Sequence, residues 1–140
     1  MAALSTLLEA AIYAKAVANT TLWTSVSGRM KHGGTMAGWP FPYILYSFPN
    51  LPKANVFQSS TPVVASVTIY FDIFSANVLY AVEAGTIAGY IETVFDGTSL
   101  TMSGYQGTVI KQTNEMAIEP EEAGLFWHTQ LEYKGMACPS

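Results

Sequence analysis

The stretch VVASVTIYFDIF, residues 63–74, carries the clearest structural signal in the chain. Its side chains alternate with a period of two between an apolar face and a face that holds both polar and apolar residues, which is typical of a strand with one buried face. The apolar face is Val63, Ala65, Val67, Ile69, Phe71 and Ile73, and the opposite face is Val64, Ser66, Thr68, Tyr70, Asp72 and Phe74. Large side chains also occur on the second face, so we expect a neighbouring subunit to cover it.

The segments on either side of this strand predict a mixture of helices and strands. Apolar residues recur at helical spacing over 2–18 and 77–96, and Gly97 suits the left-handed position after the second helix. Further strands are predicted over 43–48, 98–103, 107–116 and 124–134. Consecutive strands without crossover helices favour antiparallel pairing. We therefore expect one α+β domain spanning 1–140, a two-layer domain in which an antiparallel sheet carries two helices packed on one face.

Two segments are predicted to be long loops. Residues 28–42 are rich in glycine and end in the stretch WPFP, in which Pro40 and Pro42 push the residues before them towards extended geometry. Residues 49–62 hold three prolines and no periodicity. Long loops in compact domains are often functional. Both segments carry apolar side chains, so we interpret them either as folding back on the core or as docking on neighbours.

The composition excludes several classes of protein. The net charge is −4, and the six basic residues are spread singly, so no basic patch indicates binding to nucleic acid. Cys138 is the one cysteine, which leaves no intrachain disulfide or zinc site. The first 18 residues lack the basic start of a signal peptide, and no apolar run is long enough for a membrane span.

Residues that could support catalysis do not form a recognisable constellation. His32 lies in a glycine-rich segment and Cys138 near the last residue given, and we interpret His128 as a strand histidine with a partner. The carboxylates from Glu119 to Glu122 are interpreted as a solvated turn. Trp23, Trp39 and Trp127 are interpreted as packing residues. We therefore expect no enzyme activity, no cofactor and no metal site.

The order of several segments resembles a known family. An N-terminal helix is followed by the segments SGRMKHGG, GWPFPYILYS, ASVTIYFDIFS, NVLYAVEAGTIAGYIETVFDG, TSLTMSG and GLFWHTQLEY, and the similarity covers about residues 2–135. The pattern is similar to the tail terminator, or tail completion, proteins of long-tailed phages and gene-transfer particles. The resemblance implies a virion protein of the tail or neck that forms a hexameric ring. Such a ring caps the tail tube, joins it to the head connector and lets DNA pass through its lumen without specific binding.

The same hypothesis assigns contact residues to this chain. We expect residues 29–39 and 50–60 to be docking loops. Polar contacts are expected from Arg29, Lys31, His32 and Lys53, apolar anchors from Trp39 and Phe57, and further interface contacts from Tyr70 and Phe74. Four other interpretations stay open: a head-completion or stopper protein, a tail-tube subunit, a small-ligand-binding α+β domain and a monomeric chaperone-like domain.

Overall fold

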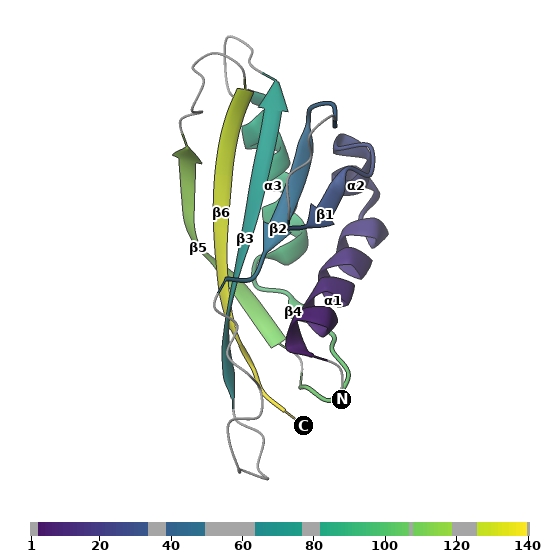
Figure 1. The fold of residues 1–140 in the computed structure, drawn as a ribbon, viewed down its shortest axis with the longest axis vertical. Coiled ribbons are helices and arrows are strands. Elements are labelled where there is room, and N and C mark those ends of the chain that lie inside the picture. Colours follow the sequence, from purple (N-terminus) through teal and green to yellow (C-terminus); the bar gives the residue numbers. More distant parts are fainter. Residues whose placement is uncertain are drawn as a thin grey trace.

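The computed structural model describes residues 3–33, 39–49, 64–76, 82–106, 108–118 and 126–139. These residues form three helices and six strands (Figure 1). The helices are α1 (Leu4–Ala18), α2 (Thr20–Ser25) and α3 (Val82–Phe95). The strands are β1 (Met30–His32), β2 (Tyr43–Ser47), β3 (Ala65–Ala76), β4 (Ser99–Leu100), β5 (Thr108–Ile118) and β6 (Phe126–Ala137). The α+β class predicted from the sequence is confirmed.

The strands form one mixed sheet in the order β1-β2-β3-β6-β5-β4. β1 pairs with β2 in parallel, and the other pairs are antiparallel. The expectation of a purely antiparallel sheet was therefore wrong at one edge. The glycine-rich segment expected to be a loop contains β1, because Met30 and His32 find partners in Ile44 and Tyr46. The described helices number three rather than the two expected, because residues 20–25 form the short helix α2.

The centre of the sheet is the long pair of β3 and β6. Their twelve residues stay in register from Ala65 opposite Ala137 to Ala76 opposite Phe126. Burial alternates along β3 as the sequence predicts, with odd positions from Ala65 to Ile73 buried and even positions partly or fully exposed. β6 also runs three residues beyond its predicted end. The main chain of Cys138 then accepts a hydrogen bond of 2.7 Å from Gln106, so Cys138 does not lie on a free tail.

The core lies between the buried face of β3 and side chains from the helices. α1 contributes Leu4, Leu8, Ile12 and Ala16, and α3 contributes Ala84, Ile87, Ala88, Ile91, Val94 and Phe95. Phe71 is fully buried, and its ring centroid lies 4.9 Å from that of Phe95 and 5.4 Å from that of Tyr133. The same cluster includes the buried residues of α1. Packing between helices and one face of β3 thus supplies most of the buried apolar side chains.

Local signals explain where α2 and α3 begin and end. The side chain of Asn19 accepts a hydrogen bond of 2.9 Å from the main-chain N–H of Leu22, which caps α2. α3 ends at Phe95, and Gly97 follows with a φ of +71°, as predicted. The predicted start of this helix, residues 77–81, lies outside the described residues. Cap residues in the sequence therefore mark the start of α2 and the end of α3.

β5 approaches β6 unusually closely at Gly135. Gly135 lies opposite Ile110, and a Cβ atom at this position would lie 2.6 Å from the carbonyl oxygen of Val109. Further along the pair, the register shifts between Gln112 and Asn114, which indicates a bulge. The close approach accounts for a glycine inside a central strand.

Candidate functional site: the open face of the sheet

The face of the sheet turned away from the core is the candidate functional surface. Residues directly opposite each other on neighbouring strands point to the same side, so the register defines this face. We call it the open face. It comprises Tyr43, Leu45 and Ser47 of β2, Ser66, Thr68, Tyr70, Asp72 and Phe74 of β3, Lys111 and Met116 of β5, and Phe126, His128, Gln130, Glu132, Lys134 and Met136 of β6. Figure 1 shows α3 lying behind the sheet rather than on this side.

One end of the open face is a stacked group of rings. Phe74 lies at its centre, with ring centroids 4.2 Å from His128, 4.9 Å from Tyr43 and 5.8 Å from Phe126. Phe41 closes the group at 5.7 Å from Tyr43 and 5.9 Å from Phe126. We call these five residues the aromatic cluster. Each well-placed aromatic pair contributes about 0.5–1.5 kcal/mol beyond area burial. Phe41 nevertheless stays 38% exposed, so the cluster offers apolar surface to a partner.

A polar network lies beside the aromatic cluster. The Oδ1 atom of Asp72 lies 2.7 Å from Nε2 of His128 and accepts a hydrogen bond of 3.0 Å from Gln130. The interpretation of His128 as a strand histidine with a partner is confirmed. Phe74 lies opposite His128 on β3, and the two rings stack at 4.2 Å. The imidazole thus packs on an apolar ring, and this pairing of Asp72 and His128 orients a ring rather than a nucleophile.

A second network surrounds Glu132. Thr113 donates a hydrogen bond of 2.6 Å to this carboxylate, and the hydroxyl of Tyr70 donates another of 3.0 Å. The bond from Thr113, followed by that from Tyr70, lowers the pKa of Glu132 below its ordinary value. The bond to Glu132 in turn raises the pKa of Tyr70. Sequence reasoning missed both networks, because they depend on the register between strands.

The predicted contact residues near β1 have partners within the subunit. Arg29 donates from Nε to the carbonyl oxygen of Pro42 at 3.1 Å and from Nη2 to that of Phe41 at 3.3 Å. The guanidinium therefore joins the start of β1 to the residues just before β2. His32 lies on the core side, with Nδ1 3.2 Å from Oε2 of Glu9 and its ring stacked on that of Tyr46 at 5.7 Å. These two side chains are built into the fold, and their roles in docking stay a prediction.

The remaining predicted contact residues divide into two groups. Lys31 is exposed on β1, opposite Leu45 of the open face. Trp39 extends the aromatic cluster, with its ring edge-on to Tyr43 at 6.1 Å. Tyr70 and Phe74 both lie on the open face, although each also has internal partners. Lys53 and Phe57, with the predicted loop over 50–60 and part of the loop over 29–39, lie outside the described residues.

The part of the chain that the structure describes contains no group of three or more His, Cys, Asp or Glu side chains that could hold a metal ion. Its helices are all too short or too polar to cross a bilayer.

Comparison with known proteins finds similarity among solved structures. No family model matches the sequence, and no curated protein matches it. Among solved structures, a chain from the virion of a native gene transfer agent particle superimposes with a TM-score of 0.69 at 17% sequence identity. The match covers 96% of this chain and 96% of that chain. The two chains share a fold. At this identity the likeness concerns the fold over nearly the whole length of both.

Proposed function

We propose that this chain is a structural protein of a phage-like or gene-transfer particle, and that it acts as a ring-forming tail terminator. The observation that carries the proposal is the shared fold with a chain of a gene transfer agent virion over 96% of both chains. The order of sequence segments, which resembles tail terminator proteins, favours this role among the parts of a virion.

The exposed surface supports assembly with copies of itself. Charged residues make up only 11% of the chain, well below the typical quarter. Val64, Met116 and Met136 are large apolar side chains left about half exposed, and Phe41 adds the edge of the aromatic cluster. An apolar surface with few charges is typical of protein–protein contacts. A closed ring, which we propose to be a hexamer, would bury much of it.

The ring is proposed to have two protein partners and a passage for DNA. The tail-tube protein would bind one end and the head connector or stopper protein the other, with the segments 29–39 and 50–60 as docking loops. Arg29, Lys31 and Trp39 border the first loop. The net charge of −4 on each subunit would keep DNA from binding the lumen during transit. No catalytic step is needed for this role.

A tail-tube subunit and a stopper protein are the nearest competing roles. The shared fold is compatible with all three, because the matched structure is a whole virion. They differ in how copies associate. A tube subunit stacks without limit, whereas a terminator stops at one ring.

The test is assembly of the purified protein. Light scattering over a range of concentrations, with negative-stain images, should show a closed ring or a monomer that forms one ring on the end of an isolated tail tube. The capped tubes should then stop growing when more tube protein is added. Long tubes formed by this protein alone would assign it as a tube subunit. A monomer that ignores both tubes and connectors would refute the proposal.

A further inference from the structure

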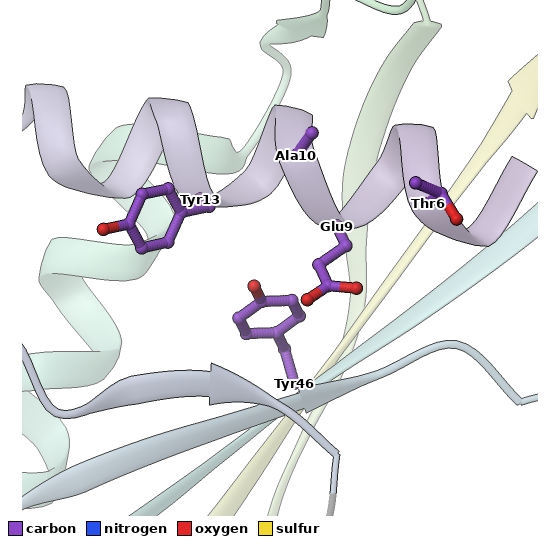
Figure 2. Close-up of a pocket in the computed structure, with 5 residues that line it drawn as sticks. All are labelled: Thr6, Glu9, Ala10, Tyr13 and Tyr46. Carbon is purple, nitrogen blue, oxygen red and sulfur yellow. The ribbon is translucent and has the colours of Figure 1, made fainter. Parts of the chain in front are cut away.

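A depression in the surface lies between α1 and the edge of the sheet, on the side away from the open face. It has a volume of about 360 Å³ and is lined by Thr6, Glu9, Ala10, Tyr13 and Tyr46. Figure 2 shows that the ring of Tyr46 and the carboxylate of Glu9 point towards each other, with Tyr13 along the same helix. We call these five residues the α1 pocket.

The chemistry of the α1 pocket suits a cation. The side chain of Glu9 is 51% exposed, and its one described polar partner is His32 at 3.2 Å. Tyr13 is 52% exposed and offers an aromatic ring beside the carboxylate. Burial, more than the neighbouring charges, raises the pKa of Tyr46 to about 12, so this hydroxyl stays protonated at neutral pH. A carboxylate flanked by aromatic rings binds an ammonium or guanidinium group through charge and cation–π attraction.

The open face carries cations without a strong partner. Lys111 and Lys134 lie directly opposite each other on β5 and β6, and Lys134 is 56% exposed. Like charges placed opposite each other in a sheet are unfavourable. The described carboxylates of this face are engaged elsewhere: Asp72 contacts His128, and Glu132 accepts bonds from Thr113 and Tyr70 while lying 3.9 Å from Lys134.

Both surfaces also expose apolar side chains. Tyr13 and Val17 lie one turn apart on α1, and both are more than two-fifths exposed. Val109 lies two residues from Lys111 on β5 and Met136 two residues from Lys134 on β6, and each is about half exposed. The two surfaces are therefore complementary in charge and alike in apolar content, which is the composition of a protein–protein contact.

We propose that the α1 pocket of one subunit binds a lysine, Lys111 or Lys134, on the open face of the next copy in the ring. The pocket lies on the core side of the sheet and the lysines on the other side, so one chain cannot pair them internally. A contact between two different surfaces is head-to-tail, which is the type that closes into a ring. This inference rests on the proposed function and identifies the subunit interface within it.

The experiment is a charge exchange in the full chain. Glu9→Lys should place like charges together and weaken ring formation by about tenfold or more in concentration, and so should the double change Lys111→Glu with Lys134→Glu. Combining all three changes should restore rings. Glu92→Lys is the matched control, because Glu92 is an exposed carboxylate in the last turn of α3, where the helix dipole favours a cation. Thermal melts and circular dichroism show whether each variant folds.

The outcomes separate this inference from the proposed function. If the folded Glu9→Lys variant forms rings as readily as the wild-type protein does, the proposed interface is overturned and the terminator role stands. Failure of the combined variant to form rings, although folded, would also overturn it. Intact Glu9→Lys rings that no longer bind tail tubes would assign the pocket to the tube protein instead. Absence of rings in the wild-type protein, even on tail tubes, would refute the proposed function itself.

Discussion

Replacing Gly135 with alanine should destabilise the sheet at the contact between β5 and β6. The new Cβ atom would lie 2.6 Å from the carbonyl oxygen of Val109 and 2.9 Å from Cγ2 of Ile110. Such separations are well inside van der Waals contact, and the oxygen belongs to a backbone fixed by the ladder. Forcing extra atoms into a packed region costs about 1–3 kcal/mol. That is a large fraction of the ~5–15 kcal/mol that stabilises a typical domain.

A second glycine provides a control with the opposite sign. Gly85 is exposed as the fourth residue of α3 (Val82–Phe95), and a Cβ atom there would meet no heavy atom within 4 Å. Alanine in a helix interior is more stable than glycine by about 0.5–1 kcal/mol. Gly85→Ala should therefore raise the free energy of unfolding, while the same chemical change at Gly135 lowers it.

The assay is urea unfolding followed by tryptophan fluorescence. Both variants and the wild-type protein should be compared at one concentration below that at which rings form, because assembly adds apparent stability. The midpoint for Gly135→Ala should fall with an unchanged slope. An unchanged or higher midpoint would show that β5 does not approach β6 as closely as described, and the reasoning about this contact would be wrong.

Three further predictions concern charge, capping and docking. The hydrogen bond from Thr113 lowers the folded-state pKa of Glu132. The ionised carboxylate therefore stabilises the fold above its ordinary pKa of 4.5, and this stability is lost as the pH falls through the lowered folded-state pKa. Glu132→Gln should therefore flatten the acid side of a curve of unfolding free energy against pH. Asn19→Ala should cost about 1 kcal/mol in urea unfolding, because it removes the cap of α2, and an unchanged midpoint would contradict this. Trp39→Ala should cost no more than about 0.5–1.5 kcal/mol, since one edge-on contact with Tyr43 is lost, yet impair head–tail joining in a particle-assembly assay. An unfolded Trp39→Ala variant would show that its role is structural.

The elements with strong periodicity were predictable from the sequence. The alternation around Ile69 predicts β3 and its buried face, and the helical spacing of Ala84, Ile87 and Ile91 predicts the described part of α3. These patterns are local and reflect burial on one side, so they can be recognised without knowing which element packs against the segment. The helix α1 was predicted in the same way, and its buried residues Leu4, Leu8, Ile12 and Ala16 follow helical spacing.

The features that sequence reasoning missed depend on contacts between distant residues. β1 has three residues and no period of its own, so only its parallel partner β2 makes it a strand. The pairing of Asp72 with His128 likewise requires the register of β3 and β6. Alternation placed each side chain on a face, but it did not say which residues stand opposite. The docking roles of Arg29 and Trp39 stay predictions.

The order of strands in the sheet has a consequence for how the chain folds. β3 and β6 are neighbours at the centre of the sheet, yet α3, β4 and β5 all lie between them in the sequence. Contacts between residues far apart in sequence carry a large entropic cost of loop closure and slow folding. During synthesis on the ribosome, β3 emerges long before β6, so the edge of β3 that pairs with β6 has no partner until then. The chain therefore completes its sheet only after β6 has been made, and assembly into a particle must follow that step.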